Sequence, residues 1–137
     1  MRRRVLERLV RLERQSLDAE RLALAEAMDR EAAARRAERE LHTRWSEALR
    51  EPPREAASMA LLGTFSEATR LERGRLAAEA RTHARAVERL MAALRERTAE
   101  VKRYELLAER AAAREREEYL RRWANELDEL AASRRRR

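Results

Sequence analysis

The chain has 137 residues, of which 43% are charged and only 4% are aromatic, and it contains two Gly, two Pro and no Cys. This composition excludes a compact globule with a large core, a disulfide framework and any thiolate metal site or nucleophile. Because the abundant Ala, Leu, Glu and Arg are strong helix formers, we predict an all-α protein whose core is a narrow seam between long helices.

The net charge of +7 is concentrated in two short runs of arginine. The arginines at positions 2–4 and 134–137 carry seven positive charges, and without them the 33 basic and 26 acidic residues become 26 of each sign. A neutral body argues against a nucleic-acid-binding face along a helix. The two basic runs are interpreted either as local patches for an acidic partner or phospholipid headgroups, or as solvated tails.

No apolar run is long enough to span a bilayer, the longest being Met59-Ala60-Leu61-Leu62. The opening stretch MRRRVLERLVRLERQ is basic and amphipathic, but Glu7 and Glu13 interrupt it, whereas transit peptides are poor in acidic residues. It is interpreted as the first turns of a helix. The expected location is the cytoplasm, with at most peripheral membrane association.

The first helix is predicted over about residues 3–50. Its apolar stripe comprises Leu6, Val10, Leu17, Leu24 and Met28, and resumes with Leu41, Trp45 and Ala48. Pro52-Pro53 ends this helix, because proline cannot continue the hydrogen-bond ladder and pushes the residue before it out of the helical region.

The second helix is predicted over about residues 65–133, after a turn or short helix over about 51–64 and before a basic tail at 134–137. Gly63-Thr64 is interpreted as a second break, with Thr64 or Ser66 as the cap of the long helix. Two interleaved series in this helix alternate at spacings of four and three, and nine of their twelve members are apolar. These twelve residues, the seam, are Leu76, Ala80, His83, Val87, Leu90, Leu94, Arg97, Val101, Tyr104, Ala108, Ala111 and Glu115.

Two amphipathic helices joined by a short connector predict a long antiparallel two-helix coiled-coil hairpin, one domain over residues 1–137. With the turn centred near residue 58, Trp45 is expected opposite Leu71. The first helix then ends while the second continues for more than 20 residues, so the fold class has a longer, overhanging C-terminal helix.

This overhang carries large apolar side chains at spacings of four, four and three. We call these four residues the terminal stripe: Tyr119, Trp123, Leu127 and Leu130. Left in water, each would forgo about 1.5 to 3 kcal/mol relative to burial, which predicts a binding partner. Two other interpretations stay open: a second copy of the hairpin covers the stripe, or its rings lie flat under arginine side chains.

No catalytic constellation is present in the sequence. The carboxylates lie three or four residues from arginines, which is the pattern of solvated helix faces. Glu38 and His42 share a face without a third metal ligand, and His83 is interpreted as a polar interruption that helps to set the register. We therefore expect neither enzymatic activity nor a metal or cofactor.

Several stretches together resemble the FliJ family of flagellar type III export proteins (FliJ/YscO-like ATPase stalk proteins). The first is EVKRYELLAERAAAREREEYLRRWANELDELAASR, whose end is similar to the family's Asp-Glu-x-Ala followed by basic residues. The second is LHTRWSEAL, which has an aromatic residue where the family has one near the end of its first helix. The third is LLGTFSEATRLE, which has a Phe where the family has one at the opening of its second helix. The resemblance covers nearly the whole chain.

The resemblance implies a soluble stalk in the ring of the hexameric export ATPase, monomeric when isolated, that also touches the export gate and substrate chaperones. The terminal stripe would contact the ring, with Asp128 and Glu129 as motif positions. A turn cluster, Met59, Leu62 and Phe65, would face the cytoplasmic domain of the gate. Its alternative role is to pack on Trp45 and Leu49, and Thr69 and Glu72 interrupt any apolar stripe running on from Phe65.

Three other functions stay open. An injectisome stalk protein would have the same architecture and different partners. A structural coiled coil would self-associate through the terminal stripe. A binder of nucleic acid or anionic membranes would use the basic runs, which the neutral body argues against.

Overall fold

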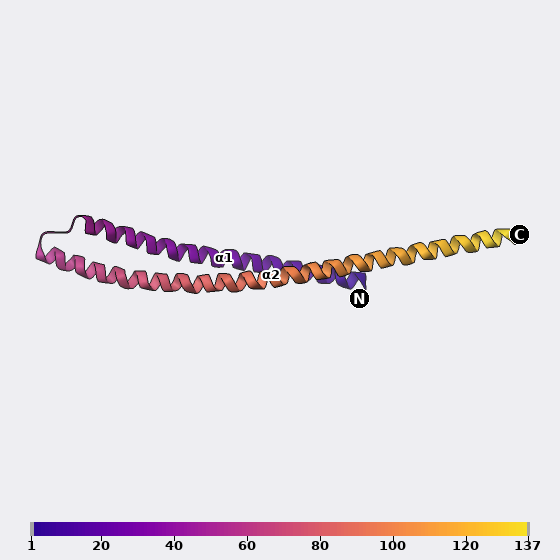
Figure 1. The fold of residues 1–137 in the computed structure, drawn as a ribbon, viewed down its shortest axis with the longest axis horizontal. Coiled ribbons are helices and arrows are strands. Elements are labelled where there is room, and N and C mark those ends of the chain that lie inside the picture. Colours follow the sequence, from indigo (N-terminus) through magenta and orange to yellow (C-terminus); the bar gives the residue numbers. More distant parts are fainter. Residues whose placement is uncertain (1, 137) are drawn as a thin grey trace. The chain divides into compact units, whose positions relative to one another are not determined.

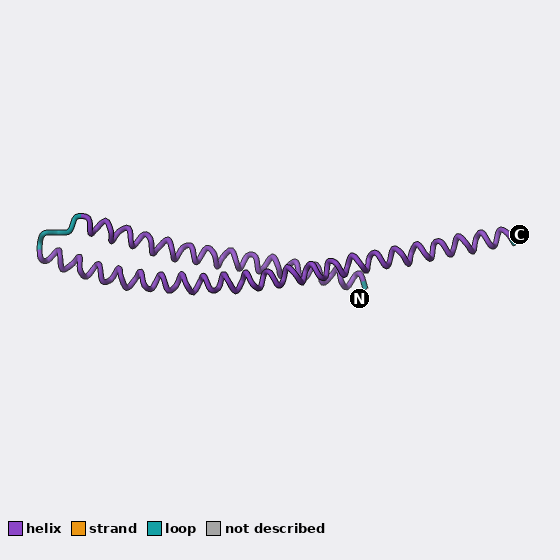
Figure 2. Tube along the Cα trace, viewed as in Figure 1, coloured by secondary structure: helices purple, strands orange, loops and turns teal. Residues whose placement is uncertain are grey.

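The computed structural model describes residues 2–136 and shows, over that range, two α-helices and no strand (Figures 1 and 2). Helix α1 spans Arg3–Arg50 and helix α2 spans Ala56–Arg135. The two helices pack against each other as a hairpin, which confirms the prediction of an all-α fold. The contacts divide the described chain into a turn unit, residues 19–94, and a terminal unit, residues 2–18 and 95–136.

The connection between the helices is shorter than the sequence predicted. α1 ends two residues before Pro52, and α2 begins at Ala56, with the Met59 amide donating to the Glu55 carbonyl at 2.9 Å. The expected break at Gly63-Thr64 is wrong: the Thr64 hydroxyl donates to the Ala60 carbonyl at 3.1 Å, one turn back in the same helix. Threonine makes this bond inside helices, and Thr64 lies within α2 rather than at its start.

The end of α2 also differs from the prediction. Arg134 and Arg135 are the last residues of the helix, where the sequence placed a tail, and the Arg136 amide still donates to the Ala132 carbonyl at 3.2 Å. Arginines in a last turn interact favourably with the partial negative charge at the end of a helix. Arg137 lies outside the described residues.

In the turn unit, small side chains form much of the core. Ala27 and Ala34 from α1 and Leu76, Ala80 and Val87 from α2 are buried. Met28, expected on the apolar stripe, is instead 51% exposed, because the buried positions alternate by four and three and place Ala27, three residues after Leu24, on the packed face. Alanine at these positions lets the two helices approach closely.

Side chains across the turn unit show how α1 and α2 are paired. The Trp45 indole Nε1 donates to the Ser66 hydroxyl at 2.9 Å, and Glu38 lies 3.9 Å from Arg73. The expected partner of Trp45, Leu71, is 61% exposed. The pairing is therefore shifted by five residues, since the turn is centred closer to the prolines than predicted.

In the terminal unit, Leu6, Val10 and Leu17 of α1 are buried, as are Val101 and Ala111 of α2. Ion pairs connect the helices beside this apolar core, among them Arg14–Glu105 at 2.7 Å, Arg97–Glu13 at 2.7 Å and Arg3–Glu115 at 3.5 Å. Arg3, at the start of α1, pairs with Glu115, whereas Arg14, further along α1, pairs with Glu105, which comes earlier in α2. The helices of this unit are therefore antiparallel.

Leu17→Ala is expected to lower the free energy of unfolding by about 2 kcal/mol, because a buried leucine is lost from a seam with few large side chains. Leu12→Ala is the matched control: Leu12 lies on the same helix but is 53% exposed. It should change stability by no more than about 0.5 kcal/mol. Urea unfolding followed by circular dichroism compares the two, and equal losses would contradict this packing.

Candidate partner-binding surfaces

The last part of α2 exposes every side chain. All residues from 114 to 136, here called the exposed segment, are exposed, and the ion pair of Arg3 with Glu115 lies at its start. In Figure 1 the start of α1, which belongs to the same unit, does not reach the yellow end of α2. The terminal stripe lies within this segment, and its four side chains are between 48% and 68% exposed. Asp128 and Glu129 are exposed beside it.

Leu120 extends the apolar surface of the exposed segment, and the sequence analysis missed it. It is 61% exposed, three residues before Trp123 and seven before Leu127. Leu120, Trp123, Leu127 and Leu130 follow one another at three, four and three residues, the spacing of a helix–helix seam. Stepping by fours from Tyr119 concealed this pattern.

The terminal stripe is not a continuation of the face that packs on α1. From Ala111, the alternating steps of four and three lead to Glu115, Glu118, Arg122 and Asn125, all polar. With 3.6 residues per turn, the terminal stripe is rotated by roughly a quarter of a turn from the last seam residues. A partner on the stripe would therefore approach α2 from a different side than α1 does.

The two basic runs differ in their surroundings. Arg3 donates to Glu7 at 2.8 Å and to Glu115 at 3.5 Å; the hydrogen bond to Glu7 is the main cause of its raised pKa, and Glu115 adds to it. This arginine contributes to the pairing of the helices. Arg134, Arg135 and Arg136 are exposed at the end of α2.

The turn cluster lies in the first turns of α2, in the turn unit. Met59 is 48% and Phe65 is 40% exposed, whereas Leu62 is half-buried. Leu61, which the sequence analysis did not include in the turn cluster, is 72% exposed. Leu49, the expected packing partner, is itself 43% exposed. Two of the three cluster residues therefore remain open to solvent.

An open groove lies on the turn unit beside Trp45. From α2 it is lined by Gly63, Ser66, Thr69 and Gly74. A Cβ built on either glycine would meet no atom within 4 Å, so the groove is open above both. Thr69, which the sequence analysis took as an interruption of an apolar stripe, is only 5% exposed.

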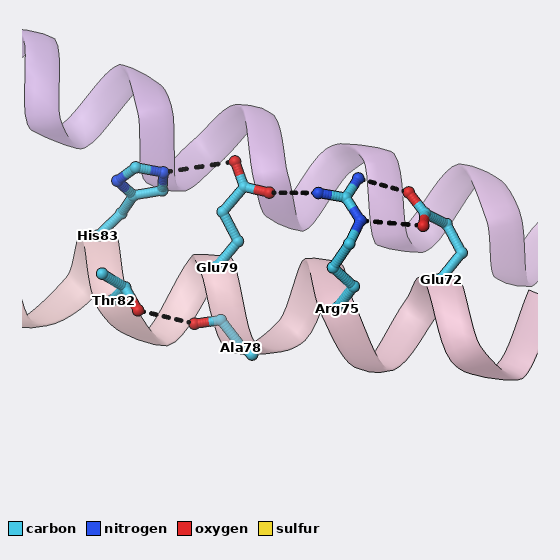
Figure 3. A network of polar contacts seen from close by, with 6 residues as sticks. All are labelled: Glu72, Arg75, Ala78, Glu79, Thr82 and His83. Carbon is cyan, nitrogen blue, oxygen red and sulfur yellow. Dashed lines mark hydrogen bonds and ion pairs between the residues drawn. The ribbon is translucent and has the colours of Figure 1, made fainter.

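Charged side chains of α2 form rows along the helix. Figure 3 shows one row: Arg75 Nε donates to Glu72 at 2.9 Å, Arg75 lies 3.4 Å from Glu79, and Glu79 lies 3.6 Å from His83. The hydrogen bond from Arg75 lowers the pKa of Glu72. Within residues 2–136, no group of three or more His, Asp or Glu is arranged to hold a metal ion.

Neither helix, over the part of the chain that is described, has the length and apolarity needed to cross a membrane. Comparison of the chain with protein-family models, with curated proteins and with solved structures found no match.

Truncation after Glu118 should leave the packing of α1 on α2 intact, because every interhelix ion pair and every buried residue described above lies before this position. The expected result is a smaller total helical signal with an unchanged unfolding midpoint, measured by circular dichroism at low protein concentration. A midpoint lowered by more than a few degrees would mean that the exposed segment contributes to the hairpin's own packing.

Proposed function

We propose that this chain is a non-enzymatic component of a bacterial flagellar type III protein export apparatus, acting as a central stalk in the export ATPase ring. The observation that carries the proposal is the exposed segment: a helix on which a row of large apolar side chains is open to solvent. Burial of such side chains in a partner is favourable, and Trp and Tyr are common anchors of interfaces.

In its finer form, the proposal describes an antiparallel coiled coil with an overhanging C-terminal helix that enters or contacts the ring. The terminal stripe would make the apolar contacts, and Asp128, Glu129 and the exposed arginines at 134–136 would make polar ones. Arg3, which the sequence analysis grouped with the basic ends, is left out of this contact because it is engaged by Glu7 and Glu115.

The proposed mechanism is mechanical and allosteric. A single helical shaft cannot match the symmetry of a hexamer, so it contacts each subunit differently. A ligand shifts a conformational equilibrium only through its different affinity for the states, so unequal contacts would bias ring assembly or the order of the ATPase cycle. No bond is made or broken by the stalk itself, and no cofactor is needed.

The turn unit would supply the other contacts of the stalk. Met59 and Phe65 are the exposed members of the turn cluster, and we propose that they face the cytoplasmic domain of the export gate. Substrate chaperones are further proposed partners. This role places the protein in the cytoplasm, peripherally associated with the inner-membrane export apparatus and active in flagellar biogenesis and motility.

Two alternatives use the same surfaces. An injectisome stalk protein would insert the terminal stripe into the ATPase of that system, and a structural coiled coil would use the stripe to build its own oligomer. Nucleic-acid binding is not favoured, because the charged rows of α2 contain acidic and basic groups in alternation.

The proposal predicts binding to the hexameric export ATPase encoded in the same genome. Trp123→Ala and Leu127→Ala should each weaken the complex at least tenfold, about 1.4 kcal/mol. Leu106→Ala is the matched control, an exposed leucine of α2 outside the exposed segment, and should leave the affinity within twofold. Affinity is measured by fluorescence anisotropy at low chain concentration.

Parallel titrations with a flagellar and an injectisome ATPase separate the two stalk functions. Binding to neither, or equal loss with Leu106→Ala and Leu127→Ala, would refute the stalk proposal.

A further inference from the structure

We propose that the surface which receives the terminal stripe is an apolar groove of the partner with a carboxylate at each end, and that Arg116 and Arg134 pair with those carboxylates. The inference rests on the proposed function, because it describes the site on the ATPase ring that the stripe contacts. Two observations carry it: the position of these arginines on the helix, and their lack of acidic neighbours.

Arg116 and Arg134 lie in line with the terminal stripe, one beyond each end. With 3.6 residues per turn, both side chains leave α2 within about 20° of the direction of Trp123. Arg116 comes three residues before Tyr119, and Arg134 comes four residues after Leu130. Along the helix axis the two arginines are about 27 Å apart, with the apolar row between them. A partner that buries the row therefore meets a positive charge at each end of it.

Neither arginine has an acidic neighbour on its own helix. Ion pairs within a helix form between residues three or four apart. At these distances from Arg116 the sequence has only alanine, tyrosine and leucine, and around Arg134 it has only apolar or basic residues. By contrast, Arg121 and Arg122 both have Glu118 within this distance. Arg116 and Arg134 are exposed, so their guanidinium groups are open to the acids of a partner.

The acidic residues of the exposed segment lie to the sides of the stripe or behind it. The nearest in direction is Glu126, about 60° from Trp123, whereas Asp128 and Glu129 are about 120° or more away. The face that carries the apolar row therefore has two positive charges and no negative one. A complementary surface has negative charge at the same two places, because like charges brought together at an interface are unfavourable.

A second copy of the chain does not offer such a surface. When two exposed segments pair antiparallel with their stripes aligned, Arg116 of each copy falls opposite Arg134 of the other. In a parallel pair, each arginine lies beside its own counterpart. Both arrangements place like charges together at the two ends, so the arginines favour a foreign partner over self-association.

Paired substitutions on opposite sides of α2 test this assignment in titrations with the export ATPase. Arg116→Gln with Arg134→Gln, the front pair, should weaken binding about fivefold or more, because the ion pairs at both ends of the groove are lost. Arg114→Gln with Arg136→Gln, the back pair, is the matched control and should leave the affinity within about twofold. Both back positions are exposed, two residues from a front position and about 140° or more from Trp123 in direction.

The salt concentration provides a second readout. The titrations are made at about 0.15 M salt, where exposed charges interact only over about 8 Å, so the back arginines are screened from a partner on the stripe. Raising the salt to about 0.5 M should weaken the wild-type complex more than the complex of the front-pair variant, because only the wild type has end ion pairs to screen. An equal salt dependence of the two complexes would overturn the inference. Circular dichroism checks that all variants stay as helical as the wild type.

The same titrations separate this inference from the stalk proposal. If the wild-type chain does not bind the ATPase, the stalk proposal fails, and the end contacts fail with it. If the wild type binds and Trp123→Ala weakens the complex, equal losses for the front and back pairs overturn this inference alone. It is also overturned if the front pair keeps the affinity of the wild type. A loss confined to the front pair supports the acid-ended groove.

Discussion

The burial of one narrow seam between α1 and α2 is the interaction on which the rest of this structure depends. A helix pair has no second layer, so each helix buries only a single stripe, and several of the buried positions are alanines such as Ala27, Ala34 and Ala80. Helix propensity alone contributes little free energy to such helices, and most of their stability in a protein comes from packing of the apolar stripe. A small seam therefore has to be accompanied by interactions that select one register out of several similar ones.

Ion pairs across the seam provide that selection. Glu13 and Arg97 lie at positions that are partly buried between the helices, and their side chains meet at 2.7 Å. Sliding one helix along the other by a turn would separate such a pair and leave a charge partly desolvated, which costs more than an exposed pair contributes. In the turn unit, the bond from Trp45 to Ser66 does the same with neutral groups. Register is thus set by polar contacts, while the apolar residues supply most of the free energy.

The helical class and the end of α1 follow from local chemistry, because composition and Pro52-Pro53 act on the residues beside them. The start of α2 depends on less local effects. Gly63 can adopt helical backbone angles as well as those of a turn, so its presence does not end a helix. The Thr64 hydroxyl can either cap a helix or bond to a carbonyl within one. The choice between Met28 and Ala27 needed the partner helix, since both fit a helical period and only packing selects between them. Leu120 was recognisable from spacing alone, but only by stepping three and four from Trp123.

Helix α2 has two apolar faces, one along the part that packs on α1 and another in the exposed segment. Along its packed part the seam residues point toward α1, whereas in the exposed segment the same steps reach Glu118, Arg122 and Asn125, and the apolar residues move to another side. If the seam continued into the exposed segment, apolar residues such as Leu or Ala would be expected at those three positions. The change of face separates two surfaces physically: residues up to Glu115 contact α1, whereas the residues after Glu118 are exposed. The interhelix ion pairs and buried residues described above all precede Glu118, so substitutions in the exposed segment after it can change that surface without removing any of them.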